Sequence, residues 1–426
     1  MSKISTVILA AGKSSRFKSS KSKLLHNLSG LPIICHVYNT AKIISGNNII
    51  VVCNKKNIIE LKNILPNCKF VIQNNQNGTA DAIKVAKPQI KTKNFIILFG
   101  DVPLINPNTI KRLVKKNKSI GRMIAFKSKN PFGYGRVFVK SKKVVEVVEE
   151  INTNTYQKKN KLCNSGIVLV NTEYFFNKLK FIKKNKKNNE KYLPDIFNIF
   201  YNYNNPFEYI VCDEDEMLGV NTLEDLIDVE RIYQKNLIKK FIKSGVLIQN
   251  ANSCYFGYDT KIAKNVVIEN NVVLKEKTQI KEGCVIKSNS YIEGATIDKN
   301  CTIGPHARIR PKTNIKNNSK IGNYVEIKNS FIGEKTAISH LSYIGDAIIG
   351  NRVNIGAGTI TCNFDGERKN LTIIKNGVFI GSNSSLIAPI IINKNVKIGA
   401  GSVVDQDIPS NYLALERSQL KIIKKK

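Results

Sequence analysis

The most regular hydrophobic pattern in the chain is a six-residue repeat that runs from Ile262 to Val404. An aliphatic residue is followed four positions later by a small or β-branched one. A helix repeats its apolar residues every three or four positions and a half-buried strand every two, so neither explains this period. The repeat predicts a left-handed parallel β-helix, in which each hexad forms one flat side of a triangular coil. In the uninterrupted series the inward positions would be Ile297, Ile303, Ile309, Ile315, Ile321 and Ile327, with Cys301, Ala307, Thr313, Ser319 and Val325 as their partners.

The first 220 residues follow a different pattern, in which short β-branched runs alternate with amphipathic segments. Strands are predicted at 5–9, 48–53, 70–73 and 95–99, and helices at 33–44, 58–65 and 79–86. Such alternation is typical of an α/β domain with a Rossmann-like, mostly parallel sheet. Ligands of these sheets bind beyond the carboxyl ends of the strands. Ala10-Ala11-Gly12 and Gly100-Asp101 follow two of these ends and are the first candidates for a site.

One long helix is predicted between the two parts, because apolar residues recur at helical intervals from 222 to 244. Acidic residues come early in it and lysines late, as the helix dipole favours. Gly245 is placed to end the helix. The expected domains are therefore residues 1–222, a linker helix at 223–245 and a β-helix domain at 246–426, within which 405–426 would be a short tail.

Composition narrows the choice of partners. A net charge of +35 is compatible with nucleic acid, an anionic membrane or small polyanions. Lys, Asn and Ile are abundant in every segment, however, and no run interleaves basic with aromatic residues, so a general compositional bias explains the charge better than nucleic-acid binding. No signal-peptide core and no apolar stretch of about 18 residues is present, so we expect a cytoplasmic protein without a membrane partner.

The nine cysteines are scattered, without a C-x-x-C pair or a His/Cys cluster at zinc spacing. We therefore expect reduced, mostly buried thiols. Cys284 and Cys301 occupy inward hexad positions, where a thiol acts as a small hydrophobe.

The segment from Leu9 to Arg16, after the first predicted strand, is rich in small residues that let backbone N–H groups approach a phosphate chain. Arg16 and Lys23 would neutralise that chain. A tight strand-to-helix turn is the competing interpretation of this segment taken alone. Gln73, Gly78-Thr79-Ala80 and Leu98-Phe99-Gly100-Asp101 follow it in an order that resembles the sugar-1-phosphate nucleotidyltransferases.

This resemblance implies that the first loop holds a nucleotide and its phosphates, and that Asp101 binds Mg²⁺. A hard divalent cation, together with catalytic Arg16 and Lys23, would stabilise the charge on phosphoryl oxygens during transfer. The implied UTP contacts are Leu9, Ala10, Ala11, Gly12, Lys23, Gln73, Gly78, Thr79, Phe99, Gly100 and Asp101.

Four later segments resemble the bacterial N-acetylglucosamine-1-phosphate uridyltransferases, namely Gly133-Tyr134-Gly135-Arg136, Glu149, Asn164-Ser165-Gly166 and Gly219-Val220-Asn221. The resemblance implies sugar contacts at Gly135, Glu149 and Asn164, and a second Mg²⁺ ligand at Asn221. Taken singly, Gly135 would equally be a bulge glycine, Glu149 a solvated charge and Asn221 the N-cap of the long helix. Four such segments in register favour the binding site.

Three positions depart from the pattern of this family. Ser14 stands where a second glycine is usual, Ser22 where proline is usual and Phe99 where tyrosine is frequent. If position 14 requires a positive φ, Ser14 is strained.

His340 is the candidate catalytic residue of the repeat region. It follows the inward Ile338 by two positions and is expected to project outward. An amine must lose a proton when it attacks a thioester, and imidazole suits a general base near neutral pH. Segment 361–369 interrupts the repeat and is expected to protrude as a loop, where function is often found.

Segments 304–311, 339–347 and 354–366 closely resemble the bifunctional bacterial enzymes that acetylate glucosamine-1-phosphate and then uridylylate the product. The resemblance runs from residue 4 to about 420 and implies that His340 is the base, with Glu326 assisting it. The implied ligands of the amino sugar phosphate are Arg310, Lys328, Tyr343 and Asn354, and those of acetyl-CoA are Ala357, Asn363, Phe364, Ser382, Ala400 and Arg417. Phe364 replaces a tyrosine common in the family, and the chain is about one coil short between 245 and 310, where the repeat slips from Ile292 to Ile297.

We therefore expect a homotrimeric enzyme that makes UDP-N-acetylglucosamine from UTP, acetyl-CoA and glucosamine-1-phosphate with Mg²⁺, and that needs neither nucleic acid nor membrane. One alternative is a nucleotidyltransferase whose rod only assembles or regulates it. The other is a non-enzymatic binding subunit, or a basic nucleic-acid binder, built on the same folds.

Overall fold

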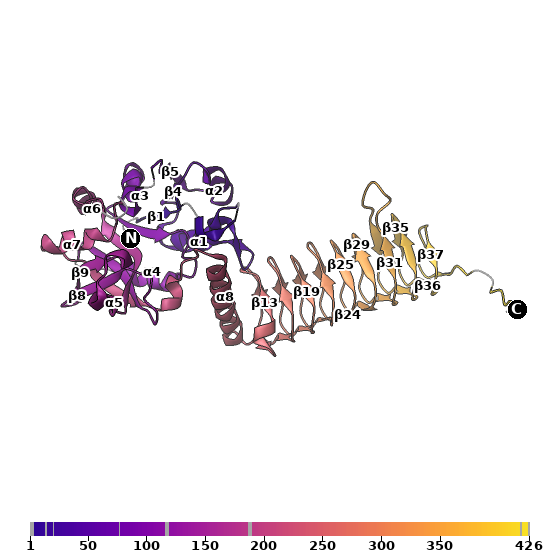
Figure 1. Cartoon of the computed structure of the whole chain (residues 1–426). Coiled ribbons are helices and arrows are strands. Elements are labelled where there is room, and N and C mark those ends of the chain that lie inside the picture. Colours follow the sequence, from indigo (N-terminus) through magenta and orange to yellow (C-terminus); the bar gives the residue numbers. More distant parts are fainter. Residues whose placement is uncertain are drawn as a thin grey trace. The chain divides into compact units, whose positions relative to one another are not determined.

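The computed structural model describes residues 4–12, 15–19, 21–75, 77–115, 119–185, 190–417 and 420–424. The chain forms two compact units, residues 1–233 and 234–426. The first contains a twisted sheet covered by helices, and the second is a stack of coils (Figure 1). Ser14, at which strain was anticipated, lies outside the described residues.

The predicted strands and helices of the first unit are confirmed to within a few residues. The predicted strands correspond to β1 (Ser5–Leu9), β4 (Ile49–Cys53), β5 (Lys69–Ile72) and β6 (Asn94–Phe99), which are mutually parallel in the order β5-β4-β1-β6. The predicted helices correspond to α1 (Ile33–Ser45), α2 (Ile58–Ile64) and α3 (Thr79–Ala86). Successive residues of β1 enter different cores, because Val7 packs with α3 and Ile8 packs with α1 and α2.

The remaining helices of this unit are α4 (Pro107–Val114), α5 (Thr155–Lys158), α6 (Thr172–Leu179) and α7 (Asp195–Asn202), with 3-10 turns η1 (Ser15–Phe17), η2 (Lys23–Leu25), η3 (Lys87–Gln89), η4 (Glu150–Asn152) and η5 (Glu214–Met217). The remaining strands are β2 (Asn27–Leu28) and β3 (Leu31–Pro32), which pair with each other, and β7 (Gly121–Lys127), β8 (Arg136–Lys140), β9 (Lys143–Val148), β10 (Leu162–Asn171) and β11 (Glu208–Cys212), which extend the main sheet.

The expectation of a mostly parallel sheet is wrong for this second half. Strand β10 runs antiparallel to both β6 and β7, and β9 runs antiparallel to both β8 and β11. Strands β8 and β9 are joined by Ser141 and Lys142, with φ of +48° and +61°, which is a two-residue hairpin turn. Such a turn usually carries Asn or Gly, so its sequence here offered no signal.

The long predicted helix is confirmed as α8 (Leu223–Lys243). Its C-terminal end is closed at Gly245, where φ is +89° and the N–H groups of Gly245 and Val246 donate to the carbonyls of Ile242 and Phe241. The division between the two units falls inside α8, so the segment expected to act as a linker contributes residues to both. None of the described helices is long and apolar enough to cross a membrane.

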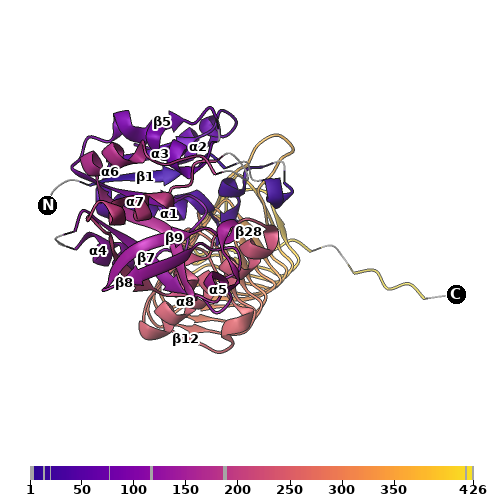
Figure 2. The ribbon, with the colours of Figure 1, turned by 60° about the vertical axis from the view of Figure 1, so that its left-hand side comes forward.

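The hexad repeat forms the predicted parallel β-helix, whose stacked coils are visible in Figures 1 and 2. All the inward positions anticipated from the repeat are buried, and the six isoleucines are fully inaccessible. Cys284 and Cys301 lie in this core as predicted. Many corner residues have a positive φ, among them Asn265, Asn271 and Asn289. Part of the abundance of asparagine is therefore structural, because asparagine tolerates this conformation better than most residues.

Three parallel sheets make up the sides of the rod. The first contains β12 (Leu247–Ile248), β15 (Val267–Ile268), β18 (Val285–Ile286), β21 (Thr302–Ile303), β24 (Lys320–Asn323), β27 (Ala337–His340), β30 (Asn354–Ile355), β33 (Phe379–Ile380), β36 (Lys397–Ile398) and β38 (Leu413–Ala414). The second contains β13 (Tyr255–Phe256), β16 (Val273–Leu274), β19 (Tyr291–Ile292), β22 (Arg308–Ile309), β25 (Glu326–Lys328), β28 (Tyr343–Gly345), β31 (Ile360–Cys362), β34 (Ser385–Ile387) and β37 (Val403–Val404). The third contains β14 (Lys261–Ile262), β17 (Gln279–Ile280), β20 (Thr296–Ile297), β23 (Asn314–Ile315), β26 (Phe331–Ile332), β29 (Ala347–Ile349), β32 (Thr372–Ile374) and β35 (Ile390–Ile392). A further 3-10 turn, η6 (Ala251–Ser253), lies in the first coil.

The rod begins at β12, close to the predicted domain start at 246 and before the visible repeat at Ile262, because η6 enlarges the first coil and hides its repeat. The predicted end of the repeat is wrong. The rod continues past Val404, since Leu413 pairs with Lys397 and the chain between them completes another coil. The expected tail from 405 is therefore partly a layer of the rod.

The repeat slips from Ile292 to Ile297 because one side of the coil there contains five residues instead of six. Strands β17, β20 and β23 pair without interruption across it. The same five-residue step recurs from Ile327 to Ile332, where the rod is also continuous. The slip is therefore a local variation in coil length, and the absence of one coil relative to the family stays a prediction.

Candidate functional site

The loop after β1 lies beside the end of β6, because Leu9 and Phe99 are register partners. Asparagine side chains brace this loop from the neighbouring strand end. Asn57 Nδ2 donates to the carbonyl of Ala10 at 2.9 Å, and Asn54 Nδ2 donates to that of Ala11 at 3.2 Å. Neither asparagine was predicted to contribute. The two predicted strand ends thus meet at one edge of the sheet, as expected from the parallel arrangement.

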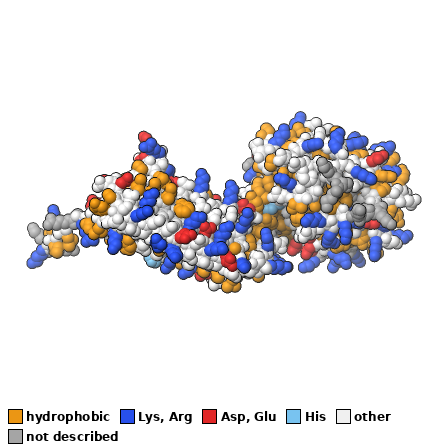
Figure 3. Space-filling model, turned by 180° about the vertical axis from the view of Figure 1, so that it is seen from behind, with side chains coloured by type: hydrophobic (Ala, Val, Ile, Leu, Met, Phe, Trp, Pro, Cys, Tyr) orange, Lys and Arg blue, Asp and Glu red, His pale blue; other side chains and the backbone are white. Residues whose placement is uncertain are grey.

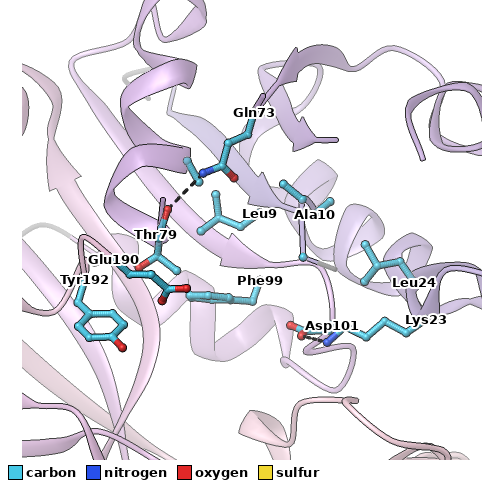
Figure 4. Close-up of a pocket in the computed structure, with 14 residues that line it drawn as sticks. Leu9, Ala10, Lys23, Leu24, Gln73, Thr79, Phe99, Asp101, Glu190 and Tyr192 are labelled. Carbon is cyan, nitrogen blue, oxygen red and sulfur yellow. Dashed lines mark hydrogen bonds and ion pairs between the residues drawn. The ribbon is translucent and has the colours of Figure 1, made fainter. Parts of the chain in front are cut away.

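A buried lysine lies between the two predicted Mg²⁺ ligands, and its contact with Asp101 is drawn in Figure 4. Lys23 Nζ lies 2.6 Å from Asp101 Oδ2 and 2.9 Å from Asn221 Oδ1, and Arg16 Nη2 lies 3.1 Å from the same Asn221 oxygen. Ser22 has a φ of −55°, close to the value that a proline ring imposes, so this departure from the family leaves the backbone path unchanged. The four side chains predicted to act near the phosphates therefore lie together, namely Arg16, Lys23, Asp101 and Asn221.

The donor set at this point fits a magnesium ion. A carboxylate oxygen of Asp101 and an amide oxygen of Asn221 converge on a single cationic group, and oxygen ligands of this kind are what Mg²⁺ requires. The alternative role of Asn221 as a helix N-cap is wrong. Thr222 Oγ1 accepts from the N–H of Asp225, and Asp225 Oδ2 accepts from the N–H groups of Asn221 and Thr222. The side chain of Asn221 is thus directed to the site.

A cavity of about 360 Å³ adjoins this cluster and contains Gln73, Gly78 and Thr79, which are among the implied UTP contacts. Gln73 Nε2 donates to the carbonyl of Gly78 and to Asp81, each at 3.3 Å. Gly78 has a φ of +106°, and a Cβ there would lie 2.4 Å from the carbonyl oxygen of Lys191. Glycine is therefore required at this position. The cavity is lined by Leu9, Ala10, Ala11, Gly12, Lys23, Leu24, Gln73, Gly78, Thr79, Ala82, Phe99, Asp101, Glu190 and Tyr192.

Segment 190–193 forms one wall of this cavity and was missed from the sequence. The N–H of Leu193 donates to Thr79 Oγ1, and the N–H of Ala80 donates to the carbonyl of Lys191, both at 3.1 Å. These contacts bring Glu190 and Tyr192 into the lining of the cavity that also contains Phe99 (Figure 4). The segment lies in a polar stretch without hydrophobic periodicity, so the pattern could not reveal it.

A second cavity, of about 540 Å³, shares Phe99 and Asp101 with the first and contains the predicted sugar contacts Gly135, Glu149 and Asn164. Gly135 is not a bulge glycine, since the irregularity of β8 lies between Phe138 and Val139. A Cβ at Gly135 would lie 3.3 Å from Val147 Cγ1 and 3.5 Å from Glu149 Oε2. Its small size therefore keeps the carboxylate accessible. The sequence did not indicate the lining residues Phe132, Tyr134 and Met217.

Glu149 is not a solvated charge. Burial raises the pKa of its carboxyl group to about 6, and the nearby charge of Asp195 contributes in the same direction. Burial also raises the pKa of Asp195. A carboxyl group with a raised pKa in the lining of a cavity is typical of a functional site.

Replacing Glu149 with Gln is expected to stabilise the ligand-free protein at pH 8 but not at pH 4. A carboxyl group whose pKa is raised by folding destabilises the folded state once it ionises. The loss in free energy of unfolding therefore grows between about pH 4.5 and 6 and reaches its maximum above this range. The pKa difference corresponds to at most about 2 kcal/mol, and partial exposure reduces it to roughly 1 kcal/mol. Thermal unfolding should therefore show a midpoint about 2–4 °C higher for the variant at pH 8. Glu173→Gln, at an exposed position in α6, is the control, and equal shifts at both pH values would contradict the assignment.

On the rod, His340 ends β27 and is exposed, as predicted. Its Nδ1 lies 2.6 Å from Oδ1 of Asn323, its register partner on the preceding coil. Because an amide oxygen accepts, Nδ1 carries the hydrogen and Nε2 is the unprotonated nitrogen of the neutral ring. Asn323 therefore holds the tautomer that a general base requires, a role the sequence did not suggest.

Four candidate residues for the sugar phosphate share one region of the rod. Arg310, Lys328 and Tyr343 come from or directly follow β22, β25 and β28, which are neighbours in one sheet. Arg310 Nη1 lies 2.9 Å from Glu326 Oε1. Glu326 therefore contacts Arg310, a residue expected to bind the sugar phosphate, rather than His340. Asn354 lies in β30, directly beside the strand of His340.

The residues expected to contact acetyl-CoA fall into two groups. The strand registers place Ala357, Ser382 and Ala400 at the positions equivalent to His340 on the three following coils, which forms a column along one edge. Phe364 is exposed, and Lys369 Nζ lies 3.9 Å from the centre of its ring. The loop protrudes as predicted (Figure 1), but it leaves the rod only at Phe364, because 361–363 still belong to the coil.

Two predicted acetyl-CoA contacts differ from the column in their surroundings. Asn363 is buried and donates through Nδ2 to Asp346 Oδ2. Arg417 is exposed and follows the strand β38 that ends the rod. The strand register places Glu416 at the position equivalent to Ala400 on the last coil, so Arg417 follows the end of the column formed by Ala357, Ser382 and Ala400.

Comparison with known proteins covers both halves of the chain. Residues 6–164 match the MobA-like NTP transferase domain, 259–294 and 371–406 match the bacterial transferase hexapeptide repeats, and 291–364 match a GMPPB C-terminal domain. The chain is 36% identical to the bifunctional protein GlmU of Bartonella bacilliformis over 421 residues, covering 97% of this chain and 94% of the relative. It is 39% identical to that of Thermosipho africanus and 40% identical to that of Ruthia magnifica, in both cases over 440 residues, 98% of this chain and at least 96% of the relative.

The chain belongs to the GlmU family.

Membership of the GlmU family confirms the resemblance inferred from the motifs and the combination of an α/β nucleotidyltransferase domain with a parallel β-helix. Lys and Arg side chains are scattered over the described part of the face shown in Figure 3 and do not gather around one element.

Proposed function

We propose that the chain makes UDP-N-acetylglucosamine in two steps, first acetylating glucosamine-1-phosphate and then transferring a uridylyl group to the product. The observation that carries this proposal is the presence of two separate polar constellations on one chain. Lys23, Asp101 and Asn221 meet at the junction of two cavities. His340 heads a column of residues on the rod.

For uridylyl transfer, UTP would occupy the cavity between Gln73 and Lys23, and the sugar phosphate the adjoining cavity around Glu149. The phosphate oxygen of the sugar attacks the α-phosphorus, and pyrophosphate leaves. Mg²⁺ held by Asp101 and Asn221 would supply positive charge at the phosphoryl oxygens. Lys23 and Arg16 neutralise the remaining negative charge, and the shared wall at Phe99 sets the distance between the two substrates.

For acetyl transfer, Nε2 of His340 accepts the proton that the sugar amine loses as it attacks the thioester, and coenzyme A leaves as a thiol. Lys328 and Arg310 would hold the phosphate of the amino sugar as a pair of cations on adjacent coils. Acetyl-CoA would lie along Ala357, Ser382 and Ala400, whose small side chains let a ligand approach the edge of the rod closely.

A homotrimer assembled through the rods accounts for the apolar side chains exposed beside this column. Tyr324 and Leu341 are 58% and 61% exposed and occupy the corners next to Asn323 and His340. Large apolar groups that flank a catalytic residue favour burial against a second copy of the chain. We place this trimer in the cytoplasm, where UTP and acetyl-CoA are its small-molecule partners.

Simultaneous measurement of pyrophosphate and free thiol on one purified sample tests the proposal. With glucosamine-1-phosphate, acetyl-CoA, UTP and Mg²⁺ present, both products should form in equal amounts. Omission of acetyl-CoA should abolish both, and addition of N-acetylglucosamine-1-phosphate should then restore pyrophosphate alone. Release of pyrophosphate without any thiol under all conditions would favour the alternative of a nucleotidyltransferase with a structural rod.

A further inference from the structure

Asp346 is the centre of a polar ladder along one corner of the rod. Asn329, Asp346 and Asn363 occupy equivalent positions on three consecutive coils, at the ends of β25, β28 and β31. Asp346 Oδ1 accepts from Asn329 Nδ2 at 2.6 Å, and Oδ2 accepts from Asn363 Nδ2. Other corners of the rod pair asparagine with asparagine, as at Asn271 and Asn289, or with glutamate, as at Asn317 and Glu334. A carboxylate in this position is therefore not needed to form a corner.

The carboxylate of Asp346 has a third contact, with a lysine that is expected to bind the amino sugar phosphate. Lys328 Nζ lies 3.5 Å from Oδ2, the oxygen that also accepts from Asn363. Asp346 is only 8% exposed. Burial by itself would raise the pKa of Asp346, but the hydrogen bonds from Asn329 and Asn363 and the charge of Lys328 outweigh it and lower the pKa below its usual value. The residue is therefore a buried anion with all its charge directed to neighbouring side chains.

The ladder also approaches Tyr343, a third candidate for substrate binding. A Cβ added at Gly345 would lie 2.5 Å from the hydroxyl of Tyr343 and 2.9 Å from Nδ2 of Asn363. Glycine at this position thus leaves room for the tyrosine and the ladder to share one space. Asn363 in turn is followed by the protruding loop, and its carbonyl accepts from the N–H of Asn370 at the other end of that loop.

We propose that Asp346 is a positioning residue that sets the amino-sugar-phosphate site and the acetyl-CoA loop relative to each other. It does so by holding Lys328 and Asn363 through the same carboxylate oxygen. The inference rests on the proposed acetyltransferase function. Asp346 touches neither the reacting amine nor the thioester, so it acts only through these two neighbours. A shift of about 1 Å at either would be enough to weaken catalysis strongly.

The test compares Asp346→Asn with Asp298→Asn in the full-length protein. Asp298 makes a similar bridge between coils, to Lys316 Nζ at 3.0 Å, away from the candidate site. The replacement at 346 is expected to raise the KM for both glucosamine-1-phosphate and acetyl-CoA roughly tenfold, because both neighbours lose their common anchor. Asp298→Asn should change neither KM, and both variants should retain uridylyl transfer. Unchanged KM values for Asp346→Asn, or equal changes in both variants, would overturn the proposal.

A double variant separates positioning from a general structural effect. If Asp346 acts on the sugar phosphate through Lys328, then Asp346→Asn should add little to the KM for glucosamine-1-phosphate in a Lys328→Met background. If the effects of the two replacements on this KM are fully additive, Asp346 does not act through Lys328. Should Asp346→Asn fail to fold, Asn363→Ala replaces it, and a rise confined to the KM for acetyl-CoA would then overturn the coupling. Thiol release by the unaltered protein is measured first, so failure of the acetyltransferase function is recognised separately.

Discussion

Asp101→Asn is expected to reduce pyrophosphate release by a factor of roughly 10²–10³ and to leave thiol release unchanged. The carboxylate of Asp101 lies 2.6 Å from Lys23 Nζ at the junction of the nucleotide and sugar cavities. The amide has the same shape but no charge, so the site would lose the anionic ligand that a divalent cation needs. Lys23, which is largely buried, would also be left without its anionic partner.

Two measurements check this expectation. The dependence of pyrophosphate release on Mg²⁺ concentration should shift to higher concentration in Asp101→Asn, because an amide oxygen is a weaker ligand. Asp228→Asn, at an exposed position of α8, is the control and should behave as the unaltered protein. A normal Mg²⁺ dependence combined with low activity would point to a role in substrate binding instead of metal binding.

His340→Ala is expected to reduce thiol release by roughly 10²–10⁴ while uridylyl transfer continues at its normal rate. The neutral ring is held with Nδ1 bonded to Asn323, so Nε2 is the nitrogen available to take a proton from the amine. No other histidine occupies the column formed by Ala357, Ser382 and Ala400, so no neighbour can replace the lost base.

Thiol release with glucosamine-1-phosphate and acetyl-CoA, followed together with pyrophosphate release, is the measurement for His340→Ala. His306→Asn is a matched control, because His306 is also exposed on the rod and stacks on Tyr324, and asparagine accepts its φ of +53°. If either His340→Ala or Asp101→Asn abolished both activities in folded protein, the two sites would not be independent.

Much of the architecture follows directly from local patterns. The period of six predicted the β-helix and its inward residues, because each coil repeats the same inward and outward geometry. The strands at 5–9 and 95–99 were recognised because their β-branched runs are buried on both faces. The second half of the sheet was not, because its short hairpin turn, Ser141-Lys142, has no distinctive residues and because β10 pairs with β6 and β7 only through long connections.

The candidate sites were predictable only in part. Motifs identified Lys23, Asp101 and Asn221, but which of them touch one another depends on contacts that span up to 198 positions. Segment 190–193 has no pattern of its own and becomes a cavity wall only because its backbone bonds to Thr79 and Ala80.

The amino-acid sequence by itself determined that this protein has an α/β nucleotidyltransferase domain followed by a β-helix, and it indicated the residues of two candidate sites. Hydrophobic period and motif order are local properties, so they can be read without coordinates. Only the tertiary structure decided that Asn323 orients His340 and that Asp346 joins Lys328 to Asn363. The partners in these contacts lie 17 or 18 positions apart in the chain, and only the length of a coil brings them together.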